Sequence, residues 1–240
     1  MLKAIRKNTK VFLWVAVSIF ILATFVGLGG YFFTNTSNVV AKVNGEKIRY
    51  EEFNAVFLQQ LANYRNNYNI EVNEAMSNNL KKMVINELIS KKLLLQEAKK
   101  MKLKVTNEEL SSYIQKFPYF QKNGQFNKQN YLDILKMQLH VTPAVFEKDI
   151  RESLLISQLQ EKLTAEVIVT DKEVADEQAK RLKDKKTALK PEDKENIKQT
   201  LLQQKKRQTF EDWYKKQEAT AKIENNLDQV EKQMAGGGEQ

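Results

Sequence analysis

An uncharged apolar run near the start of the sequence limits what this chain can be more than any other feature does. The run extends from Val11 to Phe33 and contains no Asp, Glu, Lys or Arg. As an α-helix it would be about 35 Å long, which is enough to cross the roughly 30 Å hydrocarbon layer of a bilayer. The sequence therefore predicts a transmembrane helix over residues 11–33.

The charges on either side of this run predict its orientation. Four cations precede the run: Lys3, Arg6, Lys7 and Lys10. The next cation after it is Lys42. The positive-inside rule then places the basic segment 1–10 in the cytoplasm and everything after residue 33 outside. We expect a single-pass inner-membrane protein whose bulk is extracytoplasmic.

A cleaved signal peptide is the alternative explanation of the same run. The apolar core of a signal peptide usually has about 7–15 residues and ends at small side chains. This run is longer, and bulky Tyr31, Phe32 and Phe33 follow the glycines directly. The pattern favours a membrane anchor.

The composition of the whole chain favours helices. With eight Gly and three Pro in 240 residues, long helices are expected in preference to a sandwich or barrel. The absence of Cys excludes disulfides, thiolate metal sites and cysteine nucleophiles. The net charge of +9 could indicate nucleic-acid binding, but the cations are dispersed beside Glu and Asp. We therefore expect no nucleic-acid partner.

After a short linker, residues 34–38, the sequence predicts a small sheet formed by both ends of one domain, residues 39–226. Asn44-Gly45 separates two strand-like stretches, an arrangement typical of a hairpin with a type I′ turn. The other short strand-like stretch is Ala221 to Glu224, and its pairing with the hairpin would close the domain. The tail 227–240 is expected to be disordered.

The stretch between these strands has helical apolar spacing and clear helix starts. Thr106 with Glu109, and Thr170 with Glu173, form capping boxes, and Pro143 and Pro191 stand at first helical positions. Helices are predicted over about 50–64, 73–101, 143–163 and 191–218, with two more beginning after the capping boxes. The fold class is mainly α.

Residues suited to catalysis are few. His140 is the only histidine, so it can form neither a His-rich metal site nor a recognisable triad. Paired acids such as Glu108-Glu109 fall in first turns, where they interact favourably with the helix dipole. No glycine-rich phosphate loop lies between a strand and a helix. We predict no catalytic residue, metal ligand, cofactor or small-molecule substrate.

An aromatic segment from Phe117 to Phe126 stands apart from the helical pattern. Four aromatics surround a Pro and a Gly turn in a connection that is not helical. Such a segment is either an exposed binding surface or a plug that folds back between helices. The plug is favoured.

The order of these elements resembles a known family. The stretches that carry the resemblance are Val40–Ile48 followed by Phe53, Phe117–Asn127 followed by Tyr131, Leu135, Thr142 and Phe146, Val169–Val174, and Gln204–Ile223. Together they resemble the SurA/PpiD-type periplasmic chaperones. The resemblance implies a SurA-like helical domain with a small sheet closed by the C-terminal strand.

One departure from the family pattern bears on activity. The family's parvulin prolyl-isomerase domains, each roughly a hundred residues, lie between the helix after the Val-Thr-Asp segment and the closing helix. Here only a short linker, about 180–190, occupies that place, and it is far too short to bury a core. The chain is predicted not to be an enzyme.

The resemblance also implies a function. It implies an ATP-independent holdase that binds unfolded secreted or outer-membrane polypeptides at the bacterial inner membrane, with the secretion translocon as a further partner. Such a role belongs to outer-membrane protein biogenesis. The residues chosen as client contacts are aromatics and methionines: Phe117, Tyr119, Phe120, Phe126, Tyr131, Met76, Met83 and Met137. The alternative is a non-catalytic assembly subunit that docks one dedicated membrane or secretion-machinery partner.

Overall fold

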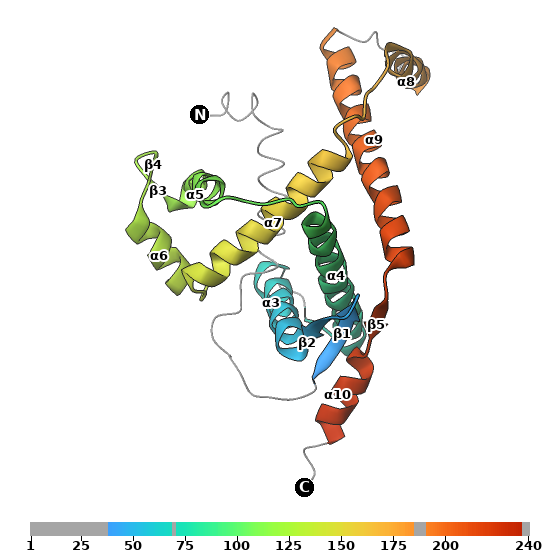
Figure 1. Cartoon of the computed structure of the whole chain (residues 1–240). Coiled ribbons are helices and arrows are strands. Elements are labelled where there is room, and N and C mark those ends of the chain that lie inside the picture. Colours follow the sequence, from blue (N-terminus) through green and yellow to red (C-terminus); the bar gives the residue numbers. More distant parts are fainter. Residues whose placement is uncertain (1–37, 69–70, 185–190, 237–240) are drawn as a thin grey trace. The chain divides into compact units, whose positions relative to one another are not determined.

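The computed structural model of the chain describes residues 38–68, 71–184 and 191–236. The predicted transmembrane segment 11–33, the basic segment 1–10 and most of the linker 34–38 lie outside these residues. Within the described residues, no helix combines the length and the apolar character needed to cross a membrane. The described chain is mainly helical with two small sheets, as the composition predicts (Figure 1).

A three-stranded antiparallel sheet joins the two ends of the described chain. Its strands are β1 (Val39–Val43), β2 (Glu46–Arg49) and β5 (Ile223–Asn225), in the order β2-β1-β5. The β1–β2 turn has Asn44 at φ 49° and Gly45 at φ 85°, which fits the predicted type I′ turn. The predicted hairpin and its closure by the C-terminal strand are both confirmed.

Three helices pack around this sheet. They are α3 (Tyr50–Tyr68), α4 (Glu74–Lys100) and α10 (Leu227–Gly236). Their apolar residues and those of the strands form one core, which includes Val40, Ile48, Phe53, Val84, Leu88, Leu227 and Val230. The predicted disorder of the tail was wrong for residues 227–236, because Leu227 and Val230 form an apolar stripe that is buried in the fold. Residues 237–240 lie outside the described chain.

A second group of elements forms an arm with its own core. The arm consists of α5 (Asn107–Gln115), the 3₁₀ turn η1 (Pro118–Phe120), β3 (Gln121–Lys122), β4 (Gln125–Phe126), α6 (Lys128–Met137) and α7 (Pro143–Leu163). The Thr106 capping box that begins α5 is present, as predicted. β3 and β4, each two residues long, pair as an antiparallel hairpin within the segment that the sequence predicts to be an aromatic loop.

The described chain divides into two compact units. One holds the residues up to Ile156 together with those from Ala221, and the other is Ser157–Thr220. The second unit contains the end of α7, α8 (Asp171–Asp184) and α9 (Pro191–Thr220). Leu159, Val174 and Ile197 are its fully buried apolar residues. The residues predicted to form one domain, 39–226, thus fall in two compact units.

Candidate functional site

The aromatic segment folds back into the arm, as the plug interpretation predicts. Phe120 is 2% exposed. Its ring makes edge-to-face contacts with Phe117, Tyr131 and Phe146, with 5.7, 5.0 and 5.6 Å between the ring centroids. Edge-to-face pairs at these distances stabilise a core beyond simple burial. Phe126 packs against the same cluster and is partly buried. In this conformation the four phenylalanines and Tyr131 hold α5, α6 and α7 together.

Tyr131 is held in this core by a polar contact as well. Its hydroxyl donates to the Glu147 carboxylate at 3.2 Å. Burial, and then the nearby Glu147 charge, raise the pKa of the Tyr131 phenol well above its ordinary 10. The hydroxyl therefore stays neutral and remains a donor at physiological pH.

Tyr119 differs from its aromatic neighbours because it faces solvent. It is 47% exposed, and one face of its ring lies stacked on Phe117 with 6.1 Å between centroids. Its backbone carbonyl accepts a hydrogen bond from the Asn130 side chain, which fixes η1 against α6. The result is an exposed ring on a rigid support.

The predicted methionines lie outside the aromatic cluster. Met83 on α4 and Met137 at the end of α6 are 57% and 69% exposed, while Met76 is half-buried. The structure thus brings the five predicted aromatics together and leaves the three methionines apart from their cluster. Methionine is often buried, and where it is exposed its flexible side chain suits irregular apolar partners.

Three further large apolar residues are exposed but are not among the predicted contacts: Leu58, Ile168 and Met234, the last of which is 39% exposed on α10. Leu58 on α3 is 51% exposed, and Ile168 before α8 is 70% exposed. Leu58 follows Phe57 directly in the sequence, so helical spacing places it off the buried face. That offset was the signal available for Leu58. Nothing in the sequence distinguished Ile168 from a buried residue.

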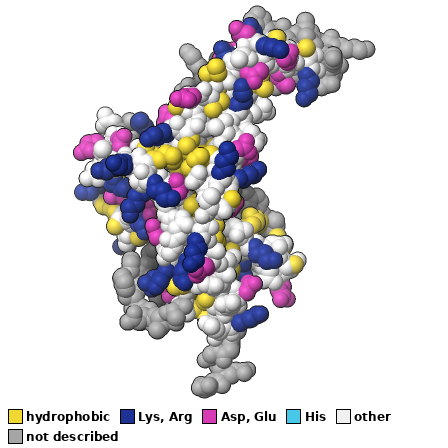
Figure 2. Space-filling view, turned by 45° about the vertical axis from the view of Figure 1, so that its right-hand side comes forward, with side chains coloured by type: hydrophobic (Ala, Val, Ile, Leu, Met, Phe, Trp, Pro, Cys, Tyr) yellow, Lys and Arg dark blue, Asp and Glu magenta, His cyan; other side chains and the backbone are white. Residues whose placement is uncertain are grey.

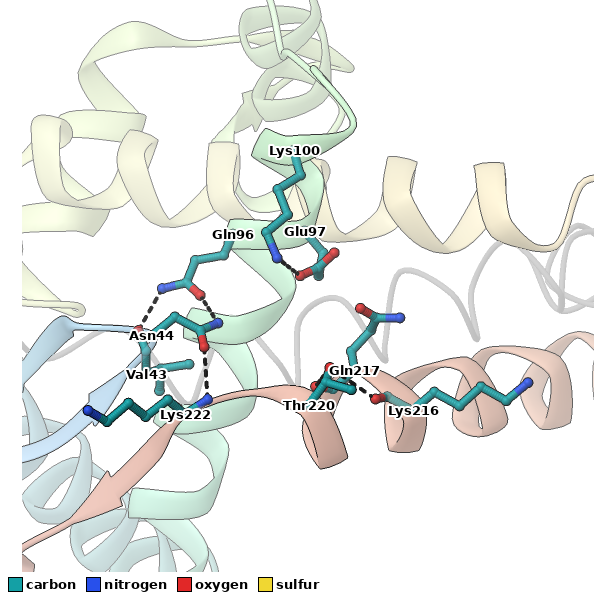
Figure 3. Close-up of polar contacts among 9 residues, drawn as sticks. All are labelled: Val43, Asn44, Gln96, Glu97, Lys100, Lys216, Gln217, Thr220 and Lys222. Atoms are coloured by element: carbon teal, nitrogen blue, oxygen red, sulfur yellow. Dashed lines mark hydrogen bonds and ion pairs between the residues drawn. The ribbon is translucent and has the colours of Figure 1, made fainter.

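A polar joint ties the hairpin to α4 and to the entry of β5 (Figure 3). The Asn44 side chain donates to Gln96 Oε1 at 2.9 Å and accepts from the Lys222 backbone at 2.9 Å. Gln96, which is buried, donates in turn to the Val43 carbonyl at 2.9 Å. Sequence reasoning identified the turn but not this joint, because its partners are 52 and 178 residues away.

An ion cluster connects α4 of the sheet-side core to α7 of the arm. Lys91 lies 2.5 Å from Glu152 and 3.5 Å from Asp149, and its side chain is 14% exposed. Burial raises the pKa of the Asp149 carboxyl despite the Lys91 charge. Glu87, one turn earlier on α4, accepts from Gln60 at 3.0 Å, and burial raises its pKa as well.

The described residues hold no group of three or more His, Cys, Asp or Glu that could bind a metal ion. His140 is exposed in a turn at φ 54°. On the face drawn in Figure 2, Lys and Arg side chains lie among Asp and Glu side chains. Such mixing is typical of a solvated surface rather than of a nucleic-acid groove.

Comparison with known proteins places these features in a family context. Residues 1–160 match the model of the SurA-like N-terminal domain. This range takes in β1 and β2, α3, α4 and nearly the whole arm. It therefore includes all eight predicted contact residues.

Individual relatives agree with the family match. The periplasmic chaperone PpiD of Escherichia coli (strain K12) is 30% identical over 157 residues, which are 62% of this chain and 24% of that protein. PpiD of Haemophilus influenzae is 32% identical over 140 residues, which are 56% of this chain and 22% of that protein. The foldase protein PrsA of Caldanaerobacter subterraneus is 31% identical over 147 residues, which are 58% of this chain and 41% of that protein. The chain spans about a quarter of the length of its PpiD relatives.

Proposed function

The chain belongs to the family of SurA-like N-terminal domains, and from this membership we propose that it is a membrane-anchored periplasmic chaperone. It holds unfolded secreted or outer-membrane polypeptides without ATP. The observation that carries the proposal is the family match over residues 1–160, which includes nearly the whole aromatic arm and the helices α3 and α4. The relatives, which are a periplasmic chaperone and a foldase protein, support the same class of activity.

The proposed client contacts are the exposed apolar side chains of this region. Tyr119, Met83 and Met137 are accessible in the described conformation. Phe117, Phe120, Phe126 and Tyr131 are proposed as contacts only when the arm opens, because they are buried or partly buried here. Met76, which is half-buried on α4, is proposed as a partly accessible contact. Burial of apolar surface contributes about 25 cal/mol per Å², so a few scattered side chains give weak, non-directional binding. Weak contacts of this kind accept many clients and release them quickly.

The proposed location depends on the predicted transmembrane segment. Residues 11–33 would anchor the chain in the inner membrane and place the rest in the periplasm, near the secretion translocon. Protease added to spheroplasts should degrade the part after residue 38 and spare the N-terminal ten residues. Protection of the whole chain from added protease would contradict this orientation.

Prolyl isomerisation is not part of the proposed function. Helix α8 ends at Asp184 and α9 begins at Pro191. A parvulin domain of roughly a hundred residues has no room between them, because a stable core needs several times that length of chain. We expect the rate of proline-peptide isomerisation to stay at the uncatalysed level. Turnover above that level would refute this part of the proposal.

Aggregation of an unfolded outer-membrane protein tests the holdase function. The full chain, held in lipid nanodiscs, should suppress the rise in light scattering at near-stoichiometric amounts without ATP. The triple variant Met83→Ala, Tyr119→Ala, Met137→Ala should suppress it less. The matched control replaces uncharged polar neighbours that are exposed, Asn79→Ala, Gln125→Ala and Gln138→Ala, and should retain full suppression. No suppression by the folded wild-type chain would overturn the proposal.

The second candidate is an assembly subunit with one dedicated partner. The Asn44 joint and the Lys91 cluster favour a fixed arrangement of helices, which suits docking to one surface. A pulldown that recovers one stoichiometric membrane protein, together with no effect on aggregation, would favour this candidate.

A further inference from the structure

A long stretch of the arm carries positive charge alone. From Leu110 to Leu132 the sequence contains no Asp or Glu, whereas it contains Lys116, Lys122 and Lys128. The acids resume at Asp133, directly after this stretch, and the chain as a whole has 30 Asp and Glu. This single-sign stretch includes the β3–β4 hairpin, at the end of the arm (Figure 1).

The fold gathers these lysines at one place, the arm tip, defined as residues 116–128. The Gln121 side chain donates to the Gln115 carbonyl at 2.8 Å, which holds β3 beside the end of α5 and Lys116. The Asn127 backbone donates to the Phe120 carbonyl at 2.8 Å, which brings the start of α6 and Lys128 beside η1. Lys122 lies in β3 itself, next to the hairpin turn.

All three lysines of the arm tip are available to a partner. Each is exposed. Among the described ion pairs none involves them, in contrast to Lys42, Lys91 and Lys205. Tyr119, in the same tip, presents an exposed ring. The tip therefore combines unpaired ammonium groups with one amphipathic aromatic.

This combination fits the headgroup layer of a bilayer. Tyrosine is enriched at the membrane–water interface, where its ring lies among headgroups, and lysine extends its ammonium toward lipid phosphates. Each lysine near an anionic surface strengthens binding by roughly fivefold. An acidic polypeptide would be recognised better by arginine, whose planar group binds carboxylates in pairs. The tip contains no arginine.

We propose that the arm tip docks on the anionic phospholipid headgroups of a bilayer through Lys116, Lys122 and Lys128, beside Tyr119. The docking is a second membrane contact, separate from any transmembrane anchor. It rests on the proposed location beside a membrane and not on client binding. Docking draws the arm to the surface from which newly translocated chains emerge.

The cysteine-free sequence allows a direct test. Gln125→Cys places a unique thiol on the exposed tip for an environment-sensitive fluorophore. The full chain is reconstituted in phosphatidylcholine nanodiscs, with and without phosphatidylglycerol. We expect a blue shift and quenching by headgroup-attached quenchers only with the anionic lipid, and both effects should be reversed by high salt.

Variants separate a specific tip contact from net charge. In Lys116→Gln, Lys122→Gln, Lys128→Gln the ratio of docked to undocked tip should fall by roughly a hundredfold. The control Lys47→Gln, Lys82→Gln, Lys104→Gln removes the same charge from exposed lysines outside the tip and should leave docking nearly unchanged. Equal loss in both variants, or no lipid-dependent shift in the wild type, would overturn the proposal. A shift with polyglutamate on zwitterionic discs that exceeds the anionic-lipid shift would also overturn it, in favour of an acidic polypeptide partner.

Failure of docking is distinguishable from failure of the holdase function. The lysine variant keeps Tyr119, Met83 and Met137, so it should still suppress aggregation. Loss of docking with retained suppression is the expected result for this variant. If the lysine variant lost both lipid docking and suppression of aggregation while its circular dichroism stayed unchanged, docking and client binding would not be separate functions.

Discussion

Two asparagines in this chain share a backbone conformation and differ in what their side chains contact. Asn44 and Asn123 both precede glycine and have φ values of 49° and 55°. Asn44 bonds to Gln96 and to Lys222, whereas Asn123 is an exposed residue at the hairpin turn. The pair separates the conformational role of asparagine from the role of its amide contacts.

Replacing each asparagine by alanine should therefore have unequal effects on stability. Both variants lose the preference of asparagine for positive φ. Only Asn44→Ala also leaves Oε1 of the buried Gln96 without the donor it has in the wild type, so it should lower the free energy of unfolding by about 1–2 kcal/mol more than Asn123→Ala does. Guanidinium unfolding of the two full-length variants gives the difference. Equal losses would show that the joint contributes nothing to stability.

Neighbouring aromatics of the arm provide a second matched pair. Phe120→Ala should lower the free energy of unfolding by about 3–5 kcal/mol, because it leaves a cavity among Phe117, Tyr131 and Phe146. Tyr119→Ala, at a residue that is largely exposed, should cost less than about 1 kcal/mol. Urea unfolding monitored by circular dichroism compares them. A small effect of Phe120→Ala would mean that the arm core is loosely packed.

At the scale of elements, an ion pair links α8 to α9. Lys205 on α9 lies 2.6 Å from the Glu173 carboxylate and also donates to the Ile168 carbonyl. Hydrogen bonds from Lys205, and then from Thr170, lower the pKa of Glu173 from 4.5 to about 2. Glu173 therefore combines its capping role with a contact between helices.

The stability of this helix pair should depend on pH through Glu173. Because the folded-state pKa is depressed, the stabilisation is fully present above pH 4.5 and is lost as the pH falls toward about 2. Glu173→Gln should remove part of this acid-dependent loss, while Glu211→Gln, an exposed control on α9, should not. The pH dependence of this stability is measured by amide hydrogen exchange in α8 and α9, corrected for the intrinsic exchange rates. An unchanged pH profile in Glu173→Gln would contradict the assignment.

Elements were predictable from the sequence where local chemistry determines them. The Asn44-Gly45 hairpin and the capping boxes at Thr106 and Thr170 depend on neighbours within four residues, and all were confirmed. Helix α10 was missed because its stability comes from burial of Leu227 and Val230 rather than from local signals. The Asn44 joint and the Lys91 cluster depend on contacts between distant segments, which a single sequence does not display.

At the scale of the whole molecule, the sequence suggests client contacts by residue type but does not predict which of them are exposed. The eight residues chosen from sequence were large apolar side chains, and helical spacing alone does not distinguish a core aromatic from a surface one. The structure separates Tyr119, Met83 and Met137 from the buried aromatics. In the described conformation only the exposed residues are accessible to a client, while the buried aromatics pack the core of the arm.

The proposed function combines a fold typical of the family with polypeptide binding and no catalysis. Family membership over residues 1–160 supports a chaperone role, and the short connection between α8 and α9 supports the absence of a parvulin insertion. For the proposed function, the chain must distinguish unfolded from folded polypeptides by apolar contacts alone. No nucleotide should alter this preference.

The most direct test is the affinity of the full chain, in nanodiscs, for one polypeptide in its unfolded and folded forms, measured by fluorescence anisotropy without nucleotide. The account predicts saturable binding of the unfolded form, weakened in the variant Met83→Ala, Tyr119→Ala, Met137→Ala, and no binding of the folded form. Equal binding of both forms, or binding of neither by a chain with native circular dichroism, would contradict the chaperone function.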